Sequence, residues 1–182
     1  MKGNRAALAG VLALVLIGGG WWLFSRSSSA PPVELIPMFA SAEKRPPGGT
    51  FEVVEAELNG EKKQAIYTMP TSRLIYKVRI PDDAWMRVSV GMKPESWTQE
   101  GDGVLFRFGA SDGRTYDELF TQHVNPFANA GDRKWIQVWV DLSAYAGEEM
   151  ELIFNTNTSQ EGKGDDPRND YALWGEPAIV IR

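Results

Sequence analysis

The sequence after Gly49 predicts an all-β domain, an antiparallel β-sandwich, and three observations support this fold class. Apolar and polar residues alternate with a period of two along several short segments, which is typical of strands with one buried face. Gly, Asp, Asn and Pro separate these segments at intervals of roughly 10 to 15 residues. No stretch of this region shows a sustained helical period. A domain covering residues 50–182 is also long enough to bury two sheet faces against each other.

Five of these segments have a clear apolar face that we expect to point into the core. Their inward residues are Leu74, Tyr76, Val78 and Ile80; Met86, Val88 and Val90; Val104, Phe106 and Phe108; Ile136, Val138, Val140 and Leu142; and Met150, Leu152 and Phe154. Phe51–Glu57 and Ala178–Ile181 are expected to be the first and last strands.

The first 24 residues follow a different pattern, which predicts a single transmembrane helix. Residues Ala6–Phe24 carry no charge and, at 1.5 Å per residue, cover about 28 Å, close to the ~30 Å hydrocarbon core of a bilayer. Lys2 and Arg5 precede this run, so the positive-inside rule places the amino terminus in the cytoplasm. The domain is then periplasmic or extracellular, and Trp21 and Trp22 are expected at the outer membrane interface.

A cleaved signal peptide is the alternative for this region, because Ser28 and Ala30 form a small-x-small cleavage site. Pro31 and Pro32 follow at once, however, and the apolar run is longer than the roughly 7 to 15 residues of a signal peptide. These features favour an uncleaved signal anchor in the cell membrane.

Residues 25–49 are rich in Ser, Pro and Gly and are predicted to be a tether between the anchor and the sandwich. The middle of this segment is apolar, and Val33, Leu35 and Phe39 are candidate partner contacts. The alternative is a short strand that enters the domain. We therefore predict three parts. Residues 1–24 form the cytoplasmic amino terminus and the transmembrane helix, residues 25–49 form the tether, and residues 50–182 form the extracytoplasmic domain.

Composition excludes several kinds of chemistry. The chain of 182 residues has no cysteine, which rules out disulfides and thiolate metal sites, and its single histidine, His123, cannot build a multi-histidine metal site. Residues 50–182 contain 14 Lys and Arg against 22 Asp and Glu, a balance of −8 that disfavours nucleic acid as a partner. No nucleophile motif or phosphate-binding loop is present, so we expect no enzymatic activity.

One set of residues between 135 and 177 resembles a known family. The matching positions are Trp135, Asp141, Leu142, Ser143, Ala146, Gly147, Asp170, Ala172 and Trp174. This segment is similar to the second half of galactose-binding-like β-sandwich domains, the jelly-roll fold common among bacterial carbohydrate-binding modules. The similarity extends to residues 103–109 and to the Asp112-Gly113 pair. Architecture alone explains these positions, since Asp141 and Ser143 suit a strand end and Gly147 suits a positive φ.

The strand at 135–141 carries aromatic residues on the face opposite its core face. Trp135, Gln137 and Trp139 point there, and Trp85 is outward on another strand. An indole in that place is covered by other side chains, offered to a protein partner or offered to a glycan; the resemblance implies a platform on which a sugar stacks. Trp85, Gln137 and Trp139 are therefore candidate partner or glycan contacts.

The loop between Thr156 and Asp170 is a candidate metal site. Asp165, Asp166 and Asp170 offer the oxygen ligands that Ca²⁺ takes, although their spacing is not that of an EF-hand loop. The resemblance implies a structural calcium, to which Glu55 of the first strand could contribute. The alternative is a solvated loop, and no other cofactor is expected.

Two functions follow from these observations. The first is a non-catalytic accessory, stabilising or docking subunit of a larger membrane protein complex, because the predicted anchor, the apolar tether and the outward aromatic residues suit assembly. The alternative is a carbohydrate-binding module displayed at the cell surface, which the family resemblance implies.

Overall fold

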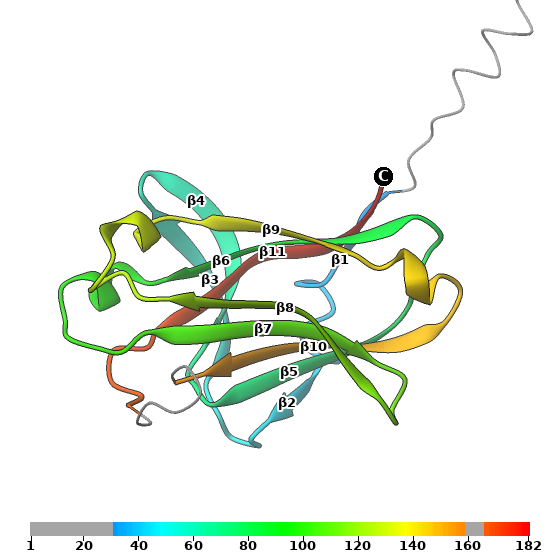
Figure 1. The fold of residues 1–182 in the computed structure, drawn as a ribbon, viewed down its shortest axis with the longest axis horizontal. Helices are drawn as coiled ribbons and strands as arrows, with labels where there is room; N and C mark the ends of the chain where they lie inside the picture. Colours follow the sequence, from blue (N-terminus) through cyan, green and yellow to red (C-terminus); the bar gives the residue numbers. More distant parts are fainter. Residues whose placement is uncertain (1–30, 159–165) are drawn as a thin grey trace, which may run out of the picture. The chain divides into compact units, whose positions relative to one another are not determined.

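The computed structural model describes residues 31–158 and 166–182, which form two antiparallel β-sheets packed face to face (Figure 1). Sheet A has the order β3-β4-β11-β6-β9, and β1 also pairs with β11. Its strands are β1 (Val33–Glu34), β3 (Phe51–Leu58), β4 (Glu61–Thr68), β6 (Ala84–Met92), β9 (Ile136–Asp141) and β11 (Ala172–Ile181). Sheet B has the order β2-β5-β10-β7-β8. Its strands are β2 (Glu43–Arg45), β5 (Ser72–Arg79), β7 (Val104–Ser111), β8 (Tyr116–Val124) and β10 (Glu149–Asn157).

Three short 3₁₀ helices, η1 (Pro94–Trp97), η2 (Ala130–Asp132) and η3 (Ser143–Tyr145), lie in the connections between these strands. The predicted antiparallel sandwich is confirmed.

The core lies between the two sheets, and it is built from the alternating residues that the sequence predicts. All the inward residues named above are buried except Ile136, which is half-buried and packs against the core. Trp174 of β11 stands edge-on to Phe106 of β7 and Phe154 of β10, with ring centroids 5.1 Å apart in both pairs. Edge-to-face contacts of this kind stabilise a core beyond simple area burial.

The motif that carries the family resemblance builds a strand end. Asp141 Oδ1 accepts hydrogen bonds from the backbone N–H of Ser143 at 2.8 Å and from its hydroxyl at 2.6 Å. These bonds lower the pKa of the Asp141 carboxyl. Gly147 has a φ of +79°, a conformation that favours glycine. Asp141, Ser143 and Gly147 are therefore explained by the turn at this strand end.

The compact unit begins at Pro31, so residues 31–49 of the predicted tether belong to the sandwich. Val33 and Glu34 pair with Ile179 and Ala178 of β11, and Glu43–Arg45 pair with β5. A short strand entering the domain, the alternative reading of this segment, is what the structure shows. The Ser/Pro/Gly composition was misleading because strands of two or three residues at a sheet edge leave almost no alternating pattern.

The predicted anchor is not tested by these residues. Ala6–Phe24, including Trp21 and Trp22, lies outside the described part of the chain, as does the predicted cleavage site. Within residues 31–158 and 166–182, no helix has the length and hydropathy to cross a membrane.

Candidate functional site

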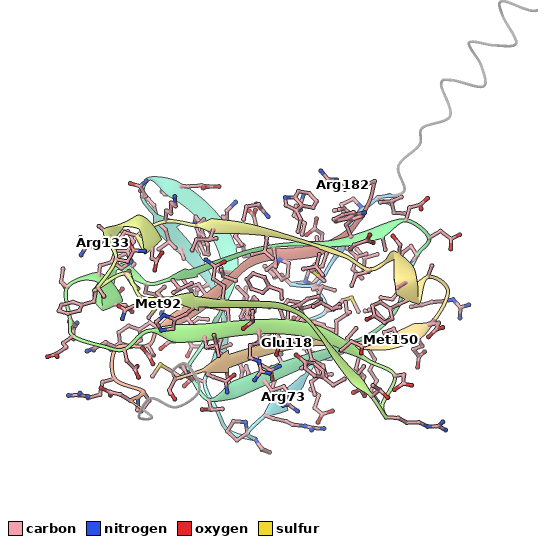
Figure 2. The ribbon with its side chains drawn as sticks, viewed as in Figure 1. Arg73, Met92, Glu118, Arg133, Met150 and Arg182 are labelled. Carbon is pink, nitrogen blue, oxygen red and sulfur yellow. The ribbon has the colours of Figure 1, made fainter. Side chains whose placement is uncertain are left out.

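The outer face of sheet A carries the predicted aromatic contacts, and their surroundings are now defined. Trp139 of β9 is 40% exposed. The guanidinium carbon of Arg182 lies 4.4 Å from the centre of the Trp139 ring and 5.3 Å from that of Trp85 (Figure 2). Arg87, which is opposite Trp139 in the β6–β9 pairing, forms an ion pair with Glu34 at 3.7 Å. Both indoles are thus already engaged by a cation of the same chain.

The other residues predicted on this face have structural partners. The Gln137 amide donates to the carbonyl of Val88 at 2.9 Å and accepts from the Ser89 hydroxyl at 3.3 Å. Trp135 is buried, and its indole N–H donates to the carbonyl of Glu61 at 3.0 Å. Trp139 is the large hydrophobic residue of this group that stays exposed to a ligand or partner.

The apolar residues of the predicted tether have different positions. Leu35 is fully buried in the core, so its prediction as a partner contact is wrong. Its side chain packs inside the folded domain, where a partner cannot reach it. Phe39 is half-buried against the same core, and the ammonium of Lys44 lies 4.2 Å from its ring centre. Val33 is exposed at the edge of the β1–β11 pair.

The three predicted calcium ligands that the structure describes, Glu55, Asp166 and Asp170, do not form one cluster. Residues 31–158 and 166–182 contain no group of three or more His, Asp or Glu that could hold a metal ion. Glu55 lies on β3, Asp170 is fully buried, and Asp166 is bonded to Arg168 at 2.8 and 2.6 Å. The Arg168 guanidinium and backbone N–H lower the pKa of Asp166 to about 2. Asp165 lies outside the described residues, so calcium binding stays a prediction.

A hollow of about 450 Å³ lies on the outer face of sheet B, on the side of the sandwich opposite Trp139. Three neighbouring strands, β5, β10 and β7, supply its floor, and β2 and β8 supply its sides. Its lining residues are Arg45, Pro46, Thr71, Ser72, Arg73, Arg107, Tyr116, Asn155 and Asn157. Figure 2 shows Arg73 and Glu118 on this side of the molecule.

Strand register brings the polar residues of this hollow into one row. Arg73 of β5 is opposite Asn155 of β10, which is opposite Arg107 of β7. The Nε–H of Arg73 donates to Asn155 Oδ1 at 2.7 Å, and the Asn155 amide lies 3.5 Å from the hydroxyl of Tyr116. Arg107 is paired with Glu118 of β8. Asn155 therefore lies between Arg73 and Arg107, which are on the two neighbouring strands.

Tyr116 supplies an apolar surface at the edge of the hollow, and its ring is 39% exposed. The ring lies against the backbone of Gly109, where an added Cβ would come within 2.6 Å of Tyr116 Cε2. The β7–β8 pairing shifts by a bulge between Phe108 and Gly109, beside the ring. Burial, followed by the charge of Glu118, raises the pKa of Tyr116 above its ordinary value near 10. The phenol is therefore neutral and able to donate at physiological pH.

Asn157 and Ser72 also line the hollow. The Oδ1 of Asn157 is buried and has no hydrogen-bond partner among the described residues. The hydroxyls of Ser72 and Thr156 lie 2.5 Å apart beneath the surface of the sheet. A buried carbonyl oxygen without a partner is what a bridging water or a ligand hydroxyl satisfies.

Sequence reasoning missed this hollow for a physical reason. Arg73 and Arg107 could be read as outward residues between apolar ones, at 73–80 and 104–108, but outward arginines are common on any sheet. The strand neighbours that bring Arg73, Asn155 and Arg107 together are separated by 82 and 48 positions in the chain. No local pattern encodes that pairing.

Comparisons with known proteins agree with the fold. No family model matches the chain. A segment of 104 residues is 38% identical to an uncharacterized protein of Archaeoglobus fulgidus, covering 57% of this chain and 25% of that protein. The matched segment therefore spans a quarter of the length of this relative.

Among solved structures, the fold is similar to that of a Clostridium perfringens GH95 CBM51 in complex with methyl-galactose. The TM-score is 0.57 at 18% identity, covering 82% of this chain and 99% of that one. A structure of the M60 catalytic domain with the CBM51-1 and CBM51-2 domains of Clostridium perfringens ZmpB matches with a TM-score of 0.55 at 14% identity, covering 76% of this chain and 14% of that one.

A third similar structure contains the CBM22-1 and GH10 modules of a Clostridium thermocellum endo-1,4-β-D-xylanase, complexed with xylohexaose. Its TM-score is 0.52 at 10% identity, covering 79% of this chain and 26% of that one. These similarities agree with the two-sheet β-sandwich of this chain. At such low identity they define the fold alone.

Proposed function

We propose that the sandwich is a carbohydrate-binding module and that the hollow on the outer face of sheet B holds the sugar. The observation that carries this proposal is the position of the exposed Tyr116 ring beside the row formed by Arg73, Asn155 and Arg107. A hollow of about 450 Å³ also lies within the range of roughly 300 to 1,000 Å³ that is usual for small-molecule sites. The carbohydrate-binding modules among the structural neighbours favour this function over that of an accessory subunit.

The chemistry of the hollow suits a pyranose. A sugar ring has an apolar face of C–H groups and an edge of hydroxyls, so it needs one flat apolar surface and several hydrogen-bonding groups. The Tyr116 ring supplies the first, because an aromatic side chain combines an apolar body with a polar tip. Arg73 and the amides of Asn155 and Asn157 supply the second. Hydrogen bonds to charged groups contribute about 1.5 to 3 kcal/mol each.

The proposed role is binding without catalysis. Glycoside hydrolysis ordinarily needs two carboxyl groups about 5 to 9.5 Å apart across the scissile bond. None of the described residues that line the hollow is Asp or Glu. Two neighbouring carboxylates, those of Glu43 and Glu118, are held by the lining residues Arg45 and Arg107.

We also propose that the sandwich is displayed outside the cytoplasm by the span predicted at Ala6–Phe24. Protease added to cells from which any outer membrane has been removed should digest the sandwich, whereas a cytoplasmic reporter stays whole. Protection of the sandwich until the cell membrane is permeabilised would place it in the cytoplasm.

The binding proposal is tested by retention of the whole chain on a panel of insoluble or immobilised polysaccharides, including β-1,4-galactan and xylan. We expect selective retention on at least one of them, loss of retention in Tyr116→Ala and its persistence in Tyr116→Phe. The phenylalanine variant keeps the ring and separates stacking from the hydroxyl. Folding of each variant is checked by circular dichroism. Absence of retention on every glycan would refute the proposal.

A second candidate function, docking in a larger membrane assembly, is favoured by one observation: Trp139 stays 40% exposed, whereas Trp135 nearby in the sequence is buried. Gentle detergent extraction followed by size separation distinguishes the two candidates. Migration at the size of the free 20.2 kDa chain excludes a stable complex, whereas co-migration with other chains that depends on Trp139 supports one.

A further inference from the structure

The hollow on sheet B has an unusual charge for this protein. Residues 50–182 carry a balance of −8, but three of the nine described residues that line the hollow are arginines. Two of these arginines are neutralised by their neighbours: Arg45 pairs with Glu43 at 2.5 Å, and Arg107 pairs with Glu118. Arg73 differs from both.

Arg73 keeps its positive charge uncompensated within the described structure. Its Nε–H donates to the neutral amide oxygen of Asn155, and no carboxylate of the described residues lies within 4 Å of its nitrogens. This bond uses one of the five N–H donors of the guanidinium and fixes the direction of the group. Its terminal nitrogens donate to no described residue, so they are available to a ligand.

The register of the strands adds to this charge. Arg45 of β2 is directly opposite Arg73 of β5, a position in which the Cβ atoms of two residues are about 4.5 to 5.5 Å apart. Like charges in directly opposite positions destabilise a strand pair. Glu43 offsets one of the two charges, and an anion bound at Arg73 would offset the other.

We propose that the hollow selects glycans that contain a uronic acid, with the sugar carboxylate bound by the terminal nitrogens of Arg73 and the sugar ring against Tyr116. The inference rests on the proposed carbohydrate-binding function and narrows its ligand class. A planar carboxylate matches the fork of guanidinium donors, and such charge-assisted pairs are about twice as strong as neutral hydrogen bonds. The anion would also relieve the repulsion between Arg45 and Arg73.

The test measures binding of the whole chain to acidic polysaccharides, each paired with its own carboxyl-reduced product. Polygalacturonate, alginate and hyaluronan cover different uronic acids, and reduction of the carboxyl to a primary alcohol keeps the linkages while removing the charge. We expect at least one acidic polymer to bind about tenfold or more tightly than its reduced partner, with the preference shrinking as salt rises. A sulfated, uronate-free galactan serves as a general polyanion.

The residue is tested with Arg73→Gln, which removes the charge, and with the matched control Arg79→Gln. Arg79 is an exposed arginine on the same face of β5, six residues and about 20 Å from Arg73. We expect Arg73→Gln to abolish the preference for the acidic polymer and Arg79→Gln to retain it. If Arg73→Gln does not fold, the comparison of acidic and reduced polymers on the unaltered chain still tests the preference for a uronic acid.

The outcomes separate the two proposals. Equal binding of an acidic polymer and its reduced partner, or selective binding of a neutral glycan, overturns the uronic-acid inference but supports carbohydrate binding. Equal binding of the sulfated galactan and the uronate polymer also overturns it, because it reports a general polyanion site. Failure to bind any glycan overturns both proposals.

Discussion

The two outer faces of the sandwich differ in which aromatic and polar side chains remain available to a ligand after folding. The face of sheet A is rich in tryptophan, but Trp135 is buried, and Trp85 and Trp139 both contact Arg182. The face of sheet B offers a single exposed ring, Tyr116, beside polar groups from three adjacent strands and a guanidinium, that of Arg73, without a carboxylate partner among the described residues. Abundance of aromatic residues is therefore a weaker indication of a binding site than groups that remain unsatisfied after folding.

The largest expected effect is a difference in stability between two substitutions on the outer face of sheet A. Trp135 and Trp139 are four residues apart and point to the same face. Trp135→Ala should lower the free energy of unfolding by about 3 to 5 kcal/mol, because its ring fills the space against Gly91 and Gly175. Trp139→Ala should cost no more than about 1 kcal/mol, since its ring is exposed and contributes chiefly through Arg182. Urea unfolding of both variants measures the difference. Similar losses would show that Trp139 is part of the structural framework.

The next largest effect is expected at Gly109, whose backbone lies against the ring of Tyr116. In Gly109→Ala the new methyl group would lie 2.3 Å from the carbonyl oxygen of Asp117 and 2.6 Å from Tyr116 Cε2. We expect a stability loss of about 1 to 3 kcal/mol and a severalfold loss of glycan retention as the ring is displaced. Gly131→Ala, in η2 and away from the hollow, is the matched control and should retain binding. Unchanged retention in Gly109→Ala would show that the ring position is irrelevant to binding.

A third prediction uses pH. Because burial and Glu118 raise the pKa of Tyr116, the phenol stays protonated at pH values where a free tyrosine begins to ionise, and glycan binding should hold from pH 7 upward until that raised pKa is approached. Above the raised pKa the phenolate loses its donor and repels an acidic sugar, so binding should weaken. Tyr116→Phe should not show this alkaline decline.

Folding must be followed in the same titration. Burial also raises the pKa of Tyr76 in the core. A tyrosine whose pKa is higher in the folded state contributes stability that is present below pH 10 and is lost as pH rises through the folded value. A loss of binding that coincides with unfolding in circular dichroism is assigned to unfolding. A loss of binding by the folded chain that Tyr116→Phe shares contradicts the prediction.

The smallest effect is expected at Arg182. Arg182→Ala removes the cation from the rings of Trp85 and Trp139 and should lower stability by about 0.5 to 1 kcal/mol. Glycan binding should not change, because the residue is on the face opposite the hollow. A change in glycan affinity in this variant would indicate that sheet A takes part in binding.

The sequence predicted the fold where a strand has one buried and one solvated face. The alternation at 73–80, 84–92 and 136–142 marks such strands, and their inward residues form the observed core. It did not reveal β4, whose first half is mostly polar and exposed. Apolar–polar alternation in a sequence reflects the burial of one strand face, so strands that bury few side chains show little alternation.

The candidate site was harder to predict than the fold. Trp139 was identified because an indole on an outward position is conspicuous in a sequence, whereas Arg73 and Asn155 are ordinary outward residues until strand pairing places them side by side. The contact of Arg182 with Trp139 joins the last strand to β9 and is equally invisible to local pattern. Leu35 was misassigned for the same reason, since its burial depends on the partner of β1.

The central claim is that sheet B, through Tyr116, binds the glycan and sheet A does not. Its most direct test is calorimetric titration of the whole chain with the best-retained glycan, comparing Tyr116→Ala and Trp139→Ala in parallel. We predict at least about a tenfold loss of affinity in Tyr116→Ala, equivalent to about 1.4 kcal/mol, and a change within about twofold in Trp139→Ala. Loss of affinity in Trp139→Ala with full affinity in Tyr116→Ala would contradict the account and place the site on sheet A.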